Sequence, residues 1–490
     1  MALFESLVLL LLISCVLLHL ARRIGLPYPT MLALAGALVA ATPWAPVIAI
    51  DPHLALVLFV APAILSAAYD ISPYELRRHW AALVALALFA VVLTTAAVAW
   101  IGWKVAGLPI AAAIALGAIV APPDAAAAQA VLNSQGLPRR TLTVLQGESL
   151  FNDAVALLIF AAAVGSVTSG DALADLAPSL ALAVPGGVVL GVIAGAAFVA
   201  LWPFWSGTLG STLIEFVSTF GIWLIAERLH VSPVLAVVAY AMWVARFAHG
   251  RQTAGDRVHS FAVWDATVFA LNVTAFLLMG LQTRSILSQL QGAEVWNALG
   301  FAALVFVCVV VVRIAWVLSY RCLLSPVLPS LRQPPAGTVQ TRLLVGWCGM
   351  RGILTLATAM SLPAQFPGRD LIVLSAFAVV LGTLILQGAT IAPLIKWLGI
   401  PKDLSLDRDV RAARSVLDAV AVDQPAEDAN FCLPRSREAE RVLVAAQRRT
   451  LQSLLLEGRV PEDAFRILQE ELDWRELSLT PHRRREIAEA

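Results

Sequence analysis

Charge is scarce in this chain of 490 residues. Only 14% are Asp, Glu, Lys or Arg, whereas a soluble protein has about a quarter. Hydrophobic residues make up 59%, which predicts an integral membrane protein. The net charge is +1 and no basic face lies outside the loops, so nucleic-acid binding is not expected.

Cysteine and metal-binding patterns are equally sparse. The five cysteines are scattered, several lie in apolar runs, and none has CxxC or metal-ligand spacing, so we expect neither disulfides nor a metal centre. HExxH, haem-ligand pairs, nucleotide-binding loops and DDxxD are missing. These absences argue against a redox enzyme, an ATP-driven pump and a polyprenyl transferase, and no cofactor is expected.

Long apolar runs, in contrast, are abundant. A bilayer core about 30 Å thick needs roughly 20 apolar residues per helix. The pattern therefore predicts an all-α polytopic membrane protein with about thirteen spans. These spans are residues 3–20, 28–43, 53–70, 80–101, 108–133, 143–167, 178–202, 212–229, 233–248, 259–283, 296–320, 341–361 and 371–397.

Basic residues orient these spans. With the N-terminus outside, fourteen Arg and Lys flank the cytoplasmic ends and four lie in outer loops, as the positive-inside rule requires. The predicted membrane domain is then 1–402. Residues 403–490, of which 32 of 88 are charged, are predicted to form a mostly helical cytoplasmic tail. That tail has either a regulatory role, through a partner, or a role in assembly.

Five ionisable side chains lie well within the spans, where a charge is costly and indicates a functional site by default. They are Asp124, Glu148, Asp153, Arg313 and Arg351.

Span 6 contains GESLFNDAVALLIF at residues 147–160. Asp153 lies about 15 Å deep at the helical rise of 1.5 Å per residue. Ser149 and Asp153 share one helix face, and Glu148 and Asn152 share another. Carboxylate, amide and hydroxyl groups together suit a small hard cation. A carboxylate at this depth is expected to bind either a proton or a cation, but not both. The alternative is a polar cluster that only holds helices together.

Span 5 contains AIVAPPDAAAAQAV at residues 118–131. Pro122 and Pro123 remove two backbone donors, so the helix must break there. Unwound backbone at membrane depth is tolerated only beside protein or water. Asp124 either caps the second half-helix or binds the ion directly. The carbonyl of Pro123 is free to face a cation.

Span 12 contains GWCGMRGILTLATAM at residues 346–360, and its three glycines predict a second break. Arg351 there either neutralises the C-terminal end of a half-helix or extends to the cytoplasmic surface. In span 11, Arg313 needs a buried partner, for which Glu148 is the best-placed candidate.

The two interrupted spans indicate an inverted repeat. Spans 4–6 and 11–13 are seven apart, so the two triplets have opposite orientation, and the middle span of each is broken. Broken helices at corresponding places in two halves are the best sequence indication of a transporter's central site. We therefore expect the central site to lie where these two broken helices cross.

GESLFNDA, APPDAAAA and GMRG resemble the monovalent cation:proton antiporters of the NhaP/NHE type, over roughly residues 1–400. The resemblance implies a homodimer, in which each protomer has a dimerisation domain and a mobile six-helix ion-translocating core that includes spans 4–6 and 11–13. It implies that Asp153 exchanges cation and proton and that Ser149 is a ligand. Asn152 in place of a second acid is similar to the electroneutral members. The resemblance further implies a salt bridge between Glu148 and Arg313.

It also implies that Asp124 and Arg351 are the charges at the helix crossing, and that Asp70 is an acidic group at the entrance. One departure is that Pro123 replaces the Thr of the family's Thr-Asp-Pro, so a hydroxyl ligand is lost. The expected function is electroneutral antiport of Na⁺, or of Li⁺ or K⁺, against H⁺ in a bacterial cell membrane. A K⁺/H⁺ antiporter of the same fold and an uncoupled channel are the alternatives.

Overall fold

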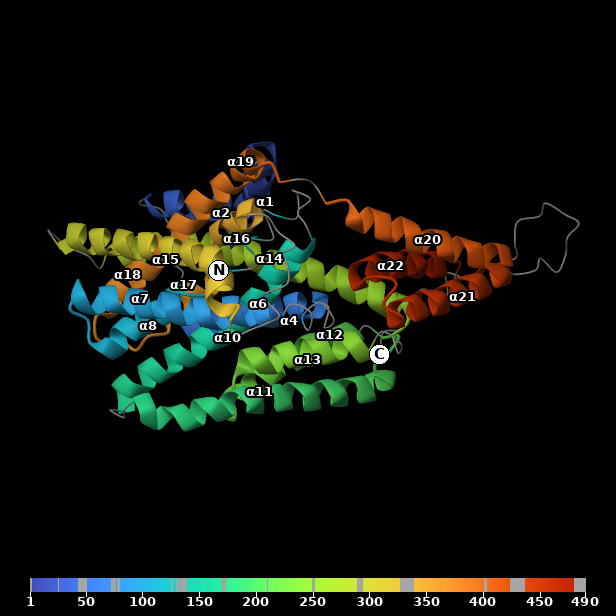
Figure 1. Cartoon of the computed structure of the whole chain (residues 1–490), viewed down its shortest axis with the longest axis horizontal. Coiled ribbons are helices and arrows are strands. Elements are labelled where there is room, and N and C mark those ends of the chain that lie inside the picture. The colour runs from blue at the N-terminus through green and yellow to red at the C-terminus, as the bar shows by residue number, and fades with distance from the viewer. Residues whose placement is uncertain are drawn as a thin grey trace, which may run out of the picture. The chain divides into compact units, whose positions relative to one another are not determined.

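A computed structural model describes most of the chain. The described residues are 2–24, 26–42, 51–71, 76, 80–124, 127–128, 132, 139–169, 173–208, 210–248, 252–288, 294–326, 339–400, 403–423 and 437–479. Their regular structure is helical (Figure 1). The helices are α1 Ala2–Ile24, α2 Tyr28–Ala40, α3 Pro52–Ala55, α4 Ala61–Asp70, α6 Trp80–Val84, α7 Ala90–Lys104, α8 Ile110–Val120, α10 Arg139–Ser169, α11 Leu173–Leu201, α12 Gly210–Arg228, α13 Pro233–Phe247, α14 Ala254–Ser288, α15 Glu294–Leu324, α16 Val339–Trp347, α17 Ile353–Met360, α18 Arg369–Gly382, α19 Gly388–Leu398, α20 Ser405–Asp423, α21 Arg437–Leu456 and α22 Glu462–Leu479.

Several of these helices are long and apolar enough to cross a membrane. Among the described residues there are seven: His53–Asp70, Trp80–Lys104, Val144–Thr168, Ala181–Phe204, Ala254–Thr283, Trp296–Leu324 and Arg369–Leu398. The other predicted spans fall on shorter apolar helices, on α12, or on the interrupted segments. The total of thirteen spans stays a prediction.

Both predicted interruptions are present. Helix α8 ends at Val120, just before the two prolines, and the peptide N–H of Ala121 still reaches back to Gly117 at 3.0 Å. After the break, the structure describes only residues 127–128 and 132 of span 5. In span 12, α16 ends at Trp347 and α17 begins at Ile353, so residues 348–352 are unwound.

Three wider π-helical turns among the described residues were not predicted. They are η1 Leu56–Val60, η2 Ala85–Phe89 and η5 Thr383–Gln387, and each lies within a helical stretch that corresponds to one predicted span. Side chains of other helices donate to the backbone of two of them. The indole of Trp316 donates to the Ala85 carbonyl at 2.9 Å, and the hydroxyl of Thr30 donates to the Leu384 carbonyl at 2.7 Å. Turns of this kind often occur at functional sites.

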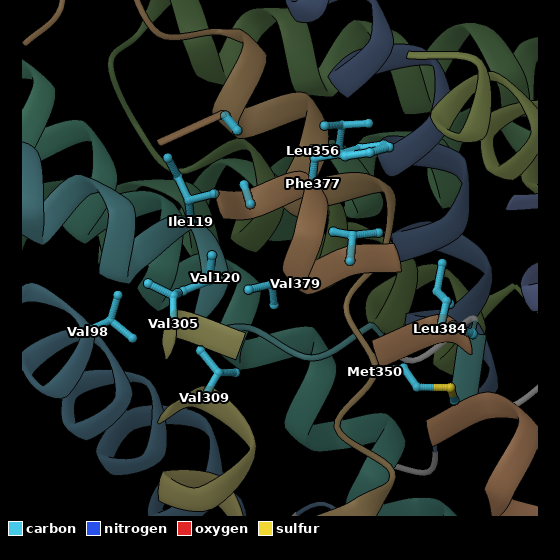
Figure 2. Packing of buried hydrophobic residues seen from close by; sticks show 14 of the residues in the cluster. Val98, Ile119, Val120, Val305, Val309, Met350, Leu356, Phe377, Val379 and Leu384 are labelled. Atoms are coloured by element: carbon cyan, nitrogen blue, oxygen red, sulfur yellow. The ribbon is translucent and has the colours of Figure 1, made fainter. Parts of the chain in front are cut away.

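The two halves of the predicted repeat share one core. Figure 2 shows Val98 of α7, Val120 of α8, and Val305 and Val309 of α15 in one buried cluster. Small residues let the helix backbones approach closely, as is usual between membrane helices. A Cβ on Gly117 would lie 2.5 Å from the backbone oxygen of Thr95, which shows how near α7 and α8 are.

By its contacts, the chain divides into two compact units. One comprises residues 1–195, 219–245 and 267–401, and the other comprises 196–218, 246–266 and 402–490. In the second unit, α20, α21 and α22 pack together (Figure 1) around buried apolar residues such as Leu451, Phe465 and Leu468. The tail therefore has a core of its own, and the helical structure predicted for it is present in α20, α21 and α22.

The second unit also ties the tail to segments that precede it in the sequence. Asp473 of α22 accepts from the guanidinium of Arg257 on α14, at 2.7 and 2.5 Å, and from Arg448 of α21 at 2.5 Å. Side chains of Asp473 and Arg257 are almost fully buried. The boundary at residue 402 stays a prediction, because this unit also contains parts of the predicted membrane domain.

Candidate functional site

The polar residues of span 6 lie on α10, a continuous helix of 31 residues. Glu148, Ser149 and Asn152 are buried, with exposed fractions of 1%, 7% and 0%, and Asp153 is half-buried. No glycine or proline lies between Glu148 and Asp153, so the four side chains keep a fixed spacing over little more than one turn. The spacing predicted from the sequence is therefore present.

Glu148 and Arg313 form a buried ion pair between α10 and α15. The two guanidinium nitrogens of Arg313 donate to the two carboxylate oxygens of Glu148, at 2.5 and 3.1 Å. The side chains are 1% and 3% exposed. A side chain on Gly349 would collide with Arg313, so the glycine leaves room for the guanidinium. The structure thus brings together the two charges that the sequence paired.

Asp124 lies where the two interruptions meet. Its peptide N–H donates to the carbonyl of Met350 at 2.7 Å, which links the unwound segment of span 5 to that of span 12. One carboxylate oxygen accepts from the N–H of Ala127 at 3.4 Å, as a helix cap does. A Cβ on Gly352 would overlap the Asp124 carboxylate, so only glycine fits opposite it. The hydrogen bond to Ala127 agrees with a capping role for Asp124. A direct role of Asp124 in binding the ion stays a prediction.

Arg351 lies on the other side of the crossing and is fully buried. Its guanidinium donates to the carbonyls of Val120 and Ala121, at 3.0 and 3.3 Å, and also to that of Gly349. The first two carbonyls end α8, where the partial negative charge of a helix is concentrated. The structure thus places the Arg351 side chain at the end of a half-helix and buries it there. Its role in neutralising that end stays a prediction.

Two of the candidate ion ligands meet at this crossing. The hydroxyl of Ser149 donates to the carbonyl of Pro123 at 3.3 Å. Asp153 lies one helical turn beyond Ser149 on α10. The side-chain amide of Asn152 is buried without a hydrogen-bond partner among the described residues. A hydroxyl and a carbonyl are thus in contact at the break in span 5, and oxygen ligands of this kind suit a hard monovalent cation.

Asp70 is the last residue of α4 and is exposed. Its position at a helix end agrees with the predicted place in the chain, and its role at an entrance stays a prediction.

Thr383 is a residue that the sequence did not indicate. Its buried hydroxyl accepts from the peptide N–H of Arg351 at 3.0 Å and donates to Val380 at 3.1 Å. It thereby joins span 13 to the unwound part of span 12. A threonine in an apolar helix usually bonds its own preceding turn, so the sequence carried no signal for this contact.

Comparison with known proteins adds to this geometry. Residues 8–397 match the family described as sodium/hydrogen exchanger, transmembrane. The Na(+)/H(+) antiporter NhaH of Halobacillus dabanensis is 31% identical over 306 residues, which cover 60% of this chain and 70% of that relative. The chain belongs to the sodium/hydrogen exchanger family. The family resemblance predicted from the three motifs is confirmed, and the exchanger is an integral membrane protein.

Two further proteins place the exchanger among its relatives. The sodium, potassium, lithium and rubidium/H(+) antiporter of Bacillus pumilus is 28% identical over 453 residues, covering 88% of the exchanger and 66% of that relative. The solved structure of MjNhaP1, the sodium proton antiporter of Methanocaldococcus jannaschii, has a TM-score of 0.63 and 17% identity, covering 81% of the exchanger and 98% of MjNhaP1. The predicted all-helical antiporter fold is therefore confirmed.

Proposed function

We propose that this protein is a secondary antiporter that exchanges Na⁺ for H⁺ across the membrane. The observation that supports this most is the contact at the crossing, where the Ser149 hydroxyl donates to the Pro123 carbonyl one helical turn away from Asp153 on α10. Its family and the activities for which its relatives are named agree with this proposal. The cation and the proton are cargo, so neither an enzymatic activity nor a resident cofactor is part of it.

In the proposed mechanism, Asp153 holds either the cation or the proton. Ser149, Asn152 and the Pro123 carbonyl replace part of the cation's hydration shell, and Asp124 adds negative charge. Arg351 and the Glu148–Arg313 pair keep the surrounding helix ends in place. The loaded core then moves so that Asp153 faces the other side of the membrane, by alternating access. One positive charge crosses each way, so the exchange is electroneutral.

A proteoliposome assay tests this function. An outward Na⁺ gradient is imposed, and internal pH is followed with a trapped dye. We expect Na⁺-dependent pH change from the native protein and none from Asp153→Asn. Asp265→Asn is the matched control, because Asp265 is an exposed carboxylate on another predicted span. Exchange retained by Asp153→Asn would refute the mechanism.

The second candidate is K⁺/H⁺ antiport at the same site. It is favoured by Pro123, which supplies a carbonyl but no side-chain hydroxyl, and by the Bacillus pumilus relative, whose name includes potassium. The same vesicles given equal gradients of Na⁺, Li⁺ and K⁺ between pH 6 and 9 distinguish the two. A third reading, an uncoupled channel, requires cation conductance that does not depend on the pH gradient.

We further propose a homodimer in a bacterial cell membrane, with the N-terminus outside and the tail in the cytoplasm. The excess of Arg and Lys at the cytoplasmic loops supports this orientation. Residues 403–490 are proposed to be a regulatory segment, since α20–α22 form a packed group that binds α14 through Arg257. Light scattering in detergent tests the dimer, and protease access to the tail in oriented vesicles tests the orientation.

A further inference from the structure

Gln387 is a buried amide that the mechanism above does not use. It is the last residue of the π-turn η5 in span 13 and has an exposed fraction of 0%. Neither its side-chain oxygen nor its side-chain nitrogen has a hydrogen-bond partner among the described residues. Buried amides almost always have partners, because water otherwise solvates them better than the protein does. A ligand that binds the Gln387 amide would explain why it is buried without a partner.

The neighbours of Gln387 place it beside the crossing. Thr383, four residues earlier, accepts from the peptide N–H of Arg351, and residues four apart share a helix face. A Cβ on Gly388, the next residue, would lie 3.6 Å from the sulfur of Met350. The carbonyl of Met350 in turn accepts from Asp124. Both ends of the turn thus contact the unwound segment that holds the candidate site, and Figure 2 labels Leu384 and Met350 in this part of the core.

The π-turn itself is supported from outside its own helix. Thr30 of α2 donates to the carbonyl of Leu384 at 2.7 Å, and its hydroxyl would meet a Cβ placed on Gly388. A wider turn of this kind rotates the side chains that follow it relative to a regular helix. The contact with α2 therefore stabilises the turn that carries Gln387.

The predicted repeat supplies an independent observation. Asn152 lies on α10, which is span 6, and span 6 corresponds to span 13 in the second triplet. Asn152 is also 0% exposed, and its amide also has no partner among the described residues. The third span of each predicted triplet thus carries one fully buried amide that has no hydrogen-bond partner among the described residues.

We propose that Gln387 is a cation-contacting residue that sets ion preference, with its side-chain oxygen as a ligand from the second half of the repeat. The proposal rests on the proposed function, since the cation is the one that Asp153 exchanges. The oxygen of Gln387 adds a neutral ligand where Pro123 lacks a hydroxyl. A neutral oxygen changes the selectivity among Na⁺, Li⁺ and K⁺ without changing the charge of the site.

The test compares Gln387→Met, which keeps the volume but removes the amide, with the native protein in two measurements. The first is exchange in proteoliposomes as a function of Na⁺, Li⁺ or K⁺ concentration. The second is the rise in melting temperature that each cation produces in detergent. We expect Gln387→Met to raise the half-maximal Na⁺ concentration about tenfold, to alter the order of preference among the three cations, and to reduce the stabilisation by Na⁺.

Ser375→Ala is the matched control. Ser375 lies in the same predicted span and is 0% exposed, but its hydroxyl donates to Leu371 of its own helix at 2.7 Å. Its removal should leave half-maximal concentrations and selectivity unchanged. Gln387→Glu tests the same position in a form that keeps an oxygen ligand, and it should bind Na⁺ at least as tightly as the native protein.

Each outcome separates this inference from the proposed function. If the native protein exchanges cations and Gln387→Met has the same concentration dependence and selectivity, the inference is overturned and the function stands. A variant that only melts at a lower temperature, with native selectivity, also overturns it, because that is a packing effect. If the native protein shows no exchange but is stabilised by Na⁺ in a Gln387-dependent way, the function fails and the inference stands.

Discussion

The buried ion pair of Glu148 and Arg313 leads to a prediction about the stability of the core. Their side chains are 1% and 3% exposed, and two hydrogen bonds of 2.5 and 3.1 Å join them. Removing one partner from such a pair leaves an uncompensated buried charge and typically costs about 3–5 kcal/mol. Removing both leaves no buried charge, so the double variant should lose less than either single variant.

The loss of stability in each variant can be measured as a fall in apparent melting temperature in detergent. This temperature is obtained from the fraction of protein that remains in the native elution peak after heating. About 2–4 °C per kcal/mol applies to chains of 150–250 residues. We therefore expect Glu148→Ala and Arg313→Ala each to melt roughly 6–20 °C below the native protein. The double variant should melt between the native protein and the single variants.

The exposed pair Arg414–Glu471 provides the control. Its two side chains are each 45% exposed, and a pair of this kind contributes about 0–1 kcal/mol. Arg414→Ala should thus leave the melting temperature almost unchanged. If the losses of Glu148→Ala and Arg313→Ala simply add in the double variant, the two residues do not interact and the pair is refuted.

Three further predictions concern the helix crossing, the tail and the charge balance of exchange. Gly352→Ala should abolish exchange, because the added Cβ overlaps the Asp124 carboxylate. Gly300→Ala should be tolerated, because nothing lies within 4 Å of its Cβ. Exchange assays on both variants check this, and an active Gly352→Ala would contradict the geometry. Arg257→Met should speed proteolysis of the tail, since it leaves the buried Asp473 with one fewer partner; unchanged cleavage would show that the contact does not hold the tail. Exchange should generate no voltage, which a potential-sensitive dye measures, and a Na⁺-dependent voltage would disprove electroneutrality.

The breaks and the charges could be predicted from the sequence because local chemistry determines them. Two consecutive prolines cannot continue a helix, so the break after Val120 follows from Pro122 and Pro123 alone. Arg313 is the only charge in a long apolar run, and such a charge needs a partner, which the structure supplies as Glu148.

The π-turn at residues 383–387 could not be predicted in this way. Its register depends on Thr30, which is more than 350 residues away and donates to the Leu384 carbonyl. Local propensity contains no information about such a contact. The roles of Thr383 and Gln387 depend on that register, so both were missed. The core of the tail could not be predicted for a different reason, because the apolar residues of α20 are interrupted by many charges and become a core only when α21 and α22 cover them.

Competition between the cation and the proton for Asp153 can be measured through the pH dependence of Na⁺ affinity. A ligand that must lose its proton before it binds a cation has an affinity that falls as the pH falls. The half-maximal Na⁺ concentration for exchange in proteoliposomes should therefore rise steadily as the pH is lowered from 9 to 6, while the maximal rate at saturating Na⁺ stays the same. A half-maximal concentration that does not change with pH would contradict exchange at a single carboxylate.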